Sequence, residues 1–237
     1  NQAYYFLDGE SVYVLSEDDD GNIQSADIVS KAFIPTTAII GKDGTMNEYQ
    51  DYNALTGKQK NEYTGDGTRK EYTIFPAFPE KDVTVVSVEI NGEATTAYTV
   101  SDKKLTFTTA PTDGATVVVT FSQAFDGAVS KMLTCDKAAI FDNRVFLANC
   151  PTDKTKFFFS ALNDPTYFPA TNFEQAGVEE LDVVDLVVMS SGVALVKEGQ
   201  GGSGYLYSIT GVSTADEIMP KAYRASLIAS SIGGVGA

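Results

Sequence analysis

The chain has 237 residues, a formal net charge of −15, and neither histidine nor tryptophan. Its 43% hydrophobic and 21% charged residues are ordinary globular values, so wholesale disorder is not expected. The acidic balance argues against nucleic-acid binding by the chain as a whole, because phosphate contacts need clustered lysines and arginines. Without histidine, a Ser-His-Asp nucleophile is excluded and the commonest metal ligand is missing.

The N-terminal residues predict two β-hairpins. Apolar runs on both sides of Asp8-Gly9 are a strong hairpin signal. A second, acidic turn spans residues 17–22, where Asp18, Asp20 and Gly21 fit part of a calcium-loop pattern. Ser16 and Asp27 stand at positions where that pattern needs Asp and Glu, so a solvated turn is the favoured interpretation and calcium the alternative.

The next thirty residues predict little regular structure. Residues 31–41 form an extended, largely apolar segment in which Pro35 argues against a central strand. Residues 41–60 are polar and lack a helical period, which predicts a loop or arm on the surface. Together with the hairpins they form the first predicted segment, residues 1–60.

A change of composition at Asn61 predicts a separate module over residues 61–125. Short alternating runs occur there between turn signals such as Asn91-Gly92, as expected for a compact β-sandwich or a small barrel. We interpret the module as an Ig-like β-sandwich inserted into a β framework made of residues 1–60 and 126–237.

The C-terminal part predicts antiparallel meanders. Residues 141–169 are expected to form a strand, a turn, a second strand and an aromatic loop. The whole range from Phe141 to Ile209 is expected to hold about four or five strands joined by tight turns. Four-stranded meanders are the blades of β-propellers. The stretch 225–229 is the one weakly helical segment, and no run of 18 apolar residues suggests a membrane-spanning helix. The predicted fold class is all-β, a partial β-propeller with an inserted sandwich.

No residue pattern predicts a catalytic, metal or cofactor site. A carboxylate pair for glycoside hydrolysis is conceivable, yet surface charge is the favoured interpretation of the candidates Asp142, Asp164, Glu179, Glu180 and Asp182. Four serines lack a histidine partner: Ser160, Ser190, Ser191 and Ser226. The glycine-rich residues 199–204 lack the Lys-Ser/Thr of a phosphate loop and are expected to link two strands. Cys135 and Cys150 cannot close a tetrahedral zinc site alone; free buried thiols are favoured over a bridge.

Aromatic residues supply the remaining candidates. Core packing is expected for most of the set Tyr5, Phe6, Phe157, Phe158, Phe159, Tyr167 and Phe168, although such rings also stack bases or sugars. Tyr167 and Phe168 lie between two prolines and are expected at the surface as an interface anchor. The possible subunit-contact loop is therefore Asp164, Pro165, Tyr167, Phe168 and Pro169. Lys154, Lys156 and Arg144 form a basic cluster too small for nucleic acid.

Residues 143–169 carry a family resemblance, in the run NRVFLANCP followed by KFFFSALNDPTYFP. They resemble tail-associated virion proteins of bacterial viruses, in which an R-V-F-x-x-G-N-P strand precedes a Y/F-x-S-x-L-x-D-P-x-Y-F-P loop. The segments YYFLDG and FIPTTAIIG fit the same pattern. Ala148 replaces the usual glycine and Cys150 also departs from the pattern, which puts the local blade packing in doubt. The module over residues 61–125 is similar to small β domains that decorate phage tail and fibre proteins.

The resemblance implies a β-propeller component of a phage tail hub or nozzle. Its expected function is structural, without enzymatic activity or cofactor: copies assemble into a homo-oligomeric ring around the DNA channel in the virion. Expected partners are other copies, neighbouring tail or connector proteins, and passing DNA without specific binding. The alternatives are a host-surface glycan-binding or glycan-degrading tail protein and a secreted bacterial adhesin. Both ends of the chain suggest an excerpt from a longer polypeptide.

Overall fold

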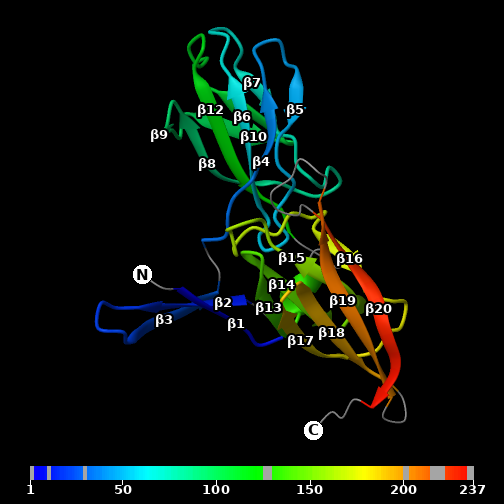
Figure 1. The fold of residues 1–237 in the computed structure, drawn as a ribbon. Helices are drawn as coiled ribbons and strands as arrows, with labels where there is room; N and C mark the ends of the chain where they lie inside the picture. Colours follow the sequence, from blue (N-terminus) through cyan, green and yellow to red (C-terminus); the bar gives the residue numbers. More distant parts are fainter. Residues whose placement is uncertain are drawn as a thin grey trace. The chain divides into compact units, whose positions relative to one another are not determined.

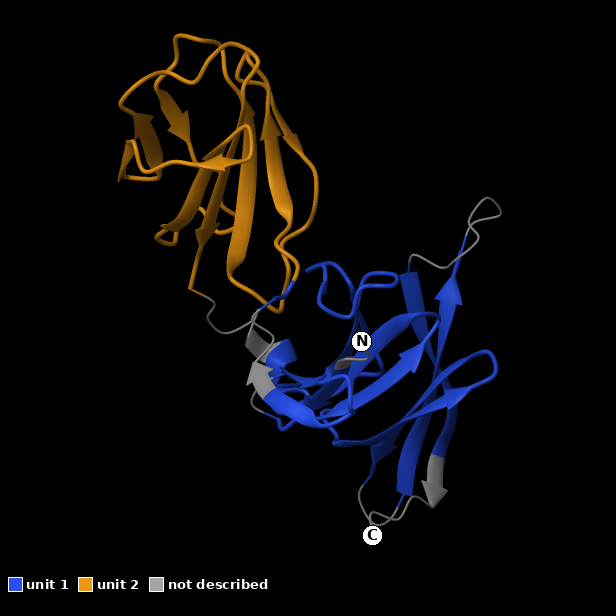
Figure 2. Cartoon of the chain, turned by 90° about the vertical axis from the view of Figure 1, so that its left-hand side faces the viewer, with its two compact units in different colours: residues 1–32, 127–237 blue, residues 33–126 orange. Residues whose placement is uncertain are grey.

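The computed structural model describes residues 3–9, 12–28, 31–124, 130–199, 203–213 and 222–233. These residues form β-strands and one short 3₁₀ helix, η1 (Ser130–Thr134), so the prediction of a nearly all-β protein is confirmed. No helix in the described ranges is long and apolar enough to cross a membrane. The chain divides into two compact units: unit 1 holds residues 1–32 and 127–237, and unit 2 holds residues 33–126 (Figure 2).

Unit 1 contains three antiparallel sheets whose strands follow chain order (Figure 1). The first has three strands, β1 (Ala3–Leu7), β2 (Val12–Glu17) and β3 (Ile23–Ile28). The second is a four-stranded meander of β13 (Lys137–Phe141), β14 (Arg144–Cys150), β15 (Asp153–Phe159) and β16 (Phe173–Gln175). The third is a four-stranded meander of β17 (Val183–Met189), β18 (Gly192–Glu198), β19 (Ser203–Val212) and β20 (Ala222–Gly233).

Local turn chemistry explains the hairpins of unit 1. Gly9 adopts a φ of 84° between β1 and β2, and Asp142 and Asn143 adopt φ values of 48° and 53° between β13 and β14. Two central residues with positive φ match the right-handed twist of the strands they join. In the acidic turn, the Asp18 carboxylate accepts hydrogen bonds from the backbone of Asp20 and Asn22. Both predicted N-terminal hairpins are confirmed by the pairing of β1, β2 and β3.

The core of unit 1 lies between its two four-stranded meanders. Phe146, Phe157 and Phe159 project from β14 and β15, and Leu195 and Ile209 meet them from β18 and β19, all in one buried cluster. The residues of β14 alternate across its sheet, so Phe146 faces this core while its neighbours in sequence face the opposite side. The stretch 225–229, expected to be weakly helical, is instead part of β20, and all of its residues except Ile228 have a partner in β19.

Unit 2 has two sheets that share one core (Figure 1). The larger sheet has the order β5-β4-β6-β12-β8-β9. Its strands are β4 (Thr36–Ile40), β5 (Met46–Glu48), β6 (Lys58–Thr64), β8 (Thr84–Ile90), β9 (Glu93–Ala94) and β12 (Thr116–Ser122). The smaller has the order β10-β11-β7, with β7 (Glu71–Thr73), β10 (Tyr98–Ser101) and β11 (Lys104–Phe107). Val117 and Val119 from the larger sheet and Leu105 from the smaller are fully buried in the shared core.

The predicted boundary at Asn61 differs from that of the structure, in which unit 2 begins at Phe33. Pro35 directly precedes β4, so its missing N–H removes no bond of the ladder, and its carbonyl accepts the Lys60 amide at 2.9 Å. The expectation that Pro35 excludes a central strand is therefore wrong, because β4 lies between β5 and β6. Residues 41–60, expected to form a loop, contain β5 and the start of β6.

Buried amide side chains in β6 explain why the sequence of residues 41–60 predicts a loop. Gln59 and Asn61 point from β6 into the unit with 0% exposure. The Gln59 amide donates to Gln123 Oε1 at 3.2 Å and accepts the Ala77 N–H at 2.9 Å. Asn61 Oδ1 accepts the Phe75 N–H at 2.8 Å. These side chains satisfy the backbone of the segment after β7, which forms no ladder of its own.

We expect a fragment of residues 33–126 to fold cooperatively and a fragment of residues 61–125 not to do so. The shorter fragment lacks β4, with the buried residues Ala38 and Ile40, and it also lacks the first three residues of β6. The rest of β6 then has an unpaired edge where β4 would lie. Urea denaturation followed by circular dichroism distinguishes the two. Equal stability of both fragments would show that β4 and β5 are not integral to unit 2.

Candidate functional site

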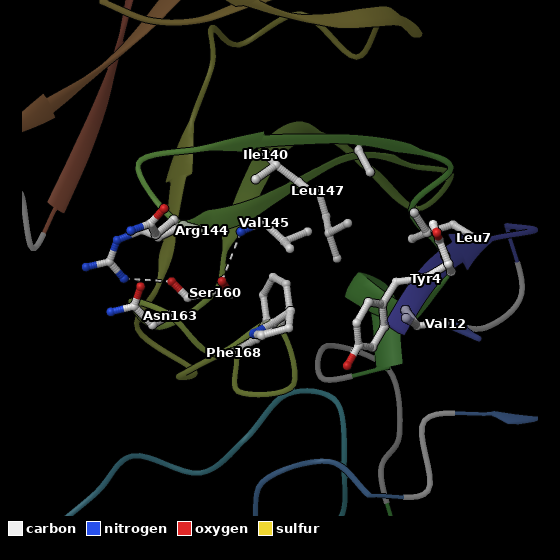
Figure 3. A pocket seen from close by; sticks show the side chains of 14 residues that line it. Tyr4, Leu7, Val12, Ile140, Arg144, Val145, Leu147, Ser160, Asn163 and Phe168 are labelled. Carbon is white, nitrogen blue, oxygen red and sulfur yellow. Dashed lines mark hydrogen bonds between the residues drawn. The ribbon is translucent and has the colours of Figure 1, made fainter. Parts of the chain in front are cut away.

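A groove within unit 1 is the candidate functional site (Figure 3). It has a volume of about 560 Å³. It lies on the face of the β13–β16 sheet opposite the core, where Ile140 of β13 and Val145 and Leu147 of β14 point. Because these residues alternate with core residues along both strands, β13 and β14 are apolar on both faces of the sheet.

The first hairpin forms another side of the groove. Tyr4 and Leu7 of β1 and Val12 of β2 line it (Figure 3). Val12 is 8% exposed, whereas Tyr4 is 46% exposed. Burial, and then the charge of Asp164, raises the pKa of the neighbouring Tyr5. The hairpin therefore covers the apolar face incompletely and leaves an open, mostly apolar hollow.

The predicted contact loop, residues 164–169, covers one side of the groove. Asp164 Oδ1 accepts the Thr166 N–H at 2.8 Å and its hydroxyl at 2.7 Å, and the Ala161 N–H donates to the Tyr167 carbonyl at 2.7 Å. This turn folds the chain back over β14, so Phe168 lies in the groove with only 2% exposure. The surface position expected for Phe168 is wrong. Its predicted neighbours Asp164, Pro165, Tyr167 and Pro169 are partly buried, and Pro165 also lines the groove.

Arg144 and Ser160 hold the polar end of the groove. Arg144 is 7% exposed, and its guanidinium donates to the Ser160 carbonyl at 2.7 Å. The Ser160 hydroxyl accepts the Val145 N–H at 3.0 Å and donates to the Ala161 carbonyl at 3.0 Å. Asn143 and Asn163 lie at the same end. The hydroxyl of Ser160 is thus used to join the loop to β14, which makes it a positioning group for the backbone.

The candidate carboxylates bind different groups on different elements. Asp182 forms an ion pair with Lys154 at 2.5 Å, and Glu179 accepts the Tyr207 hydroxyl at 2.7 Å. Asp142 accepts the Tyr223 hydroxyl at 3.4 Å, and Asp164 is occupied by its own turn as described above. Within the described residues, no group of three or more His, Cys, Asp or Glu side chains is placed to hold a metal ion.

The remaining predicted candidates lie away from the groove. Ser190 and Ser191 lie at the turn between β17 and β18, and Ser226 is exposed on β20. The lysines of the predicted basic cluster bind separate acids, because Lys156 pairs with Asp153 at 2.8 Å and Lys154 with Asp182. Of the glycine-rich residues 199–204, positions 200–202 lie outside the described residues. None of these serines, lysines and described glycine-rich residues lines the groove.

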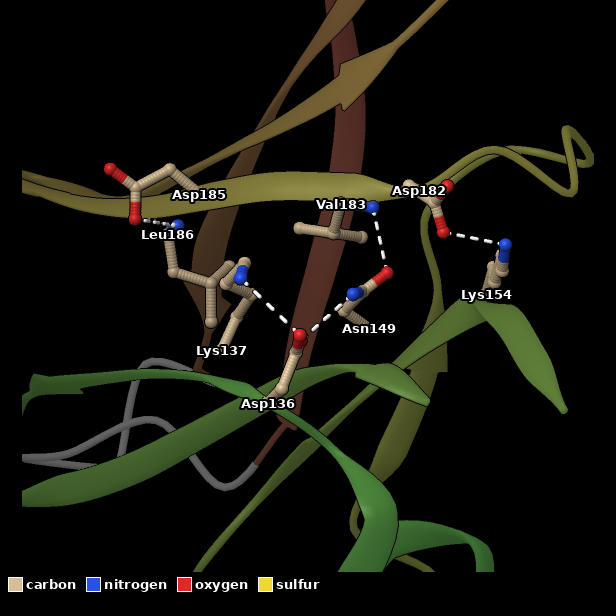
Figure 4. A network of polar contacts seen from close by, with 8 residues as sticks. All are labelled: Asp136, Lys137, Asn149, Lys154, Asp182, Val183, Asp185 and Leu186. Carbon is tan, nitrogen blue, oxygen red and sulfur yellow. Dashed lines mark hydrogen bonds and ion pairs between the residues drawn. The ribbon is translucent and has the colours of Figure 1, made fainter. Parts of the chain in front are cut away.

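A polar network joins the two meanders of unit 1 (Figure 4). Asn149 adopts a φ of 61° at an irregularity in β14, and its side chain bridges two elements. It donates to Asp136 Oδ1 at 2.8 Å and accepts the Val183 N–H at 2.9 Å. Next to it, Cys150 and also Cys135 are free and buried, as favoured from the sequence, and burial raises the pKa of the Cys135 thiol. Cys150 is thereby a core residue of this bulged strand.

Lys197 is the one fully buried charged side chain among the described residues, at 0% exposure. Its Nζ donates to the Glu179 carbonyl at 2.9 Å and lies 5.7 Å from the centroid of the Tyr207 ring. Desolvation lowers its pKa, against the opposing charges of Glu179 and Glu180. The hydrogen bond from Tyr207 lowers the pKa of Glu179. Sequence reasoning missed this cluster because Lys197 lies near the end of a strand that otherwise reads as an ordinary apolar run.

Comparisons of the chain with protein-family models, with curated proteins and with solved structures give no match.

We expect Phe168→Ala to lower the free energy of unfolding of unit 1 by about 3 kcal/mol, because it empties a buried aromatic site beneath the loop. Phe173→Ala is the matched control: Phe173 is 46% exposed, so its loss should cost less than about 1 kcal/mol. Urea denaturation of the two variants measures both values. Equal effects would contradict the buried position of Phe168.

We expect Lys197→Met to raise the free energy of unfolding at neutral pH by about 1 kcal/mol, because a buried ammonium costs more than a thioether. The pKa of folded Lys197 lies below its ordinary value of 10.5, so this cost is fully present below the folded pKa and disappears as the pH rises toward 10.5. The gain of the variant should therefore shrink as the pH is raised through that window. Urea denaturation over a series of pH values measures it.

Lys154→Met is the control for this series, because Lys154 forms a partly exposed ion pair with Asp182. It should give no comparable gain in stability. A gain for Lys197→Met that grows with pH would contradict the cost of burying the ammonium.

Proposed function

We propose that the chain is a structural component of a bacteriophage tail that acts by assembly, as part of a β-propeller in a ring of copies around the DNA channel. The observation that carries the proposal is the pair of successive four-stranded meanders that share one core. Such meanders are the repeating unit of propellers. The run of residues 143–169, which resembles phage tail proteins, forms the hairpin and closing loop of the first meander.

The roles of the polar residues in unit 1 support assembly over catalysis. Ser160, Asp164 and Arg144 are engaged in holding the 160–169 loop onto β14. The net charge of −15 favours passage of DNA without specific binding, since like charges repel. We propose that the protein is not an enzyme and that its loops contact other copies and neighbouring tail or connector proteins.

Mass spectrometry of purified virions, combined with particle imaging, tests the proposal. We expect peptides of this chain in the particles, in a copy number that fits a ring in the tail. Their absence from intact particles would reject the assignment to the virion.

The groove favours one second candidate, a tail protein that binds glycans of the host surface. Tyr4 and Tyr5 are 46% and 38% exposed in a groove that also holds Asn143 and Asn163, and exposed aromatics near polar groups suit a sugar. Specific binding on a glycan array, lost in a Tyr4→Ala variant, would favour this function.

A further inference from the structure

The edge strand β20 differs from every other sheet edge in the described chain. It has 12 residues, Ala222–Gly233, and pairs only with β19, so its outer backbone edge has no partner strand among the described residues. The remaining edge strands have 7 residues or fewer, as in β17 with 7 and β3 with 6. Long unpaired edges are templates for adding a strand, and short ones resist this.

The composition of β20 also favours the addition of a strand at this edge. The strand AYRASLIASSIG contains no acidic residue, no lysine and no proline, although the chain has 32 acidic residues. Leu227 and Ile228 are 54% and 57% exposed. Inward-pointing charges and prolines are the usual means of blocking an edge, and β20 has one charged residue, Arg224. Two copies that each carry a net charge of −15 would bring no carboxylates together along this acid-free strand.

We propose that β20 is a docking edge for a second copy of this chain, which adds its own β20 in antiparallel orientation. The segment Ala222–Leu227 pairs with β19 in unbroken register, whereas register shifts follow toward the C-terminal half of the strand. A regular segment is needed to continue a ladder, so the two-fold axis passes through this segment. Antiparallel pairing about such an axis is isologous, with the same residues contributed by each copy.

The side chains select the register within that segment. An axis at Arg224 would place two like charges directly opposite each other, which destabilises a pair of strands. An axis at Ala225 places Arg224 opposite Ser226 of the second copy, and Leu227 opposite Tyr223. Ile228 lies just beyond this pairing, at the point where the register of β20 against β19 shifts. Leu227 is thus partnered without a charge conflict, and an eight-stranded sheet results from two four-stranded ones.

The interaction is independent of the proposed virion function, and the purified chain alone tests it. We expect a dimer by sedimentation or light scattering at about 100 μM, and a double variant Leu227→Lys and Ile228→Lys should weaken dimerisation by at least about tenfold. Val178→Lys is the matched control, because Val178 is 79% exposed but lies outside any strand. Circular dichroism verifies that all three proteins fold alike.

A cysteine at the axis tests the register. Under mild oxidation Ala225→Cys should give a covalent dimer, because directly opposite side chains in antiparallel strands approach within disulfide reach. Val178→Cys should not. The proposal is overturned if the chain is monomeric at this concentration, if the lysine variant dimerises as the parent does, or if the Ala225→Cys variant dimerises without cross-linking.

Discussion

Phe146, Phe157 and Phe159 fill the space between the two four-stranded meanders, and the rest of unit 1 depends on this contact. Each buried phenylalanine contributes about 2 kcal/mol through the apolar surface it removes from water. Tyr223 of β20 packs against this cluster. Its ring centroid lies 4.8 Å from that of Phe146, with the rings edge-on, and 5.0 Å from that of Phe159. Because strands alternate, fixing these rings in the core also fixes Val145 and Leu147 on the opposite face. The groove is thus a consequence of the same register.

The order of the strands could be predicted where a local signal and a burial pattern agree. Asp8-Gly9 and the acidic turn mark hairpins that the pairing of β1, β2 and β3 confirms, and the meanders after residue 136 follow chain order as expected. In these places the turn and the alternating apolar residues specify one register. No match to a known family is needed for this part of the fold.

Prediction failed where polar side chains replace apolar ones in a buried position. Gln59 and Asn61 occupy the inner face of β6, so the strand lacks the alternation that marks a half-buried sheet, and residues 41–60 resembled a loop. The amides are tolerated because they bond the backbone at Phe75 and Ala77, which no strand satisfies. The prediction of a surface position for Phe168 was wrong for a related reason. The turn at Asp164 folds Phe168 inward, and the two flanking prolines give no sign of this in the sequence.

The groove follows from unequal coverage of one sheet. The strands β13 and β14 are apolar on both faces of their sheet, a pattern typical of strands placed between two layers. A four-stranded meander covers one face and packs against its phenylalanines, whereas the three-stranded sheet of β1, β2 and β3 supplies the side chains opposite the other face. Val12 is buried there, but Tyr4 and Ile140 stay 46% and 71% exposed.

The hollow between these side chains is therefore apolar surface that the described chain does not bury. The loop that carries Phe168 covers only one side of it, because the turn at Asp164 directs a single ring into the groove. Apolar surface that stays in contact with water forgoes about 25 cal/mol for each Å² that could be covered. An apolar group that covers part of this hollow would therefore stabilise unit 1.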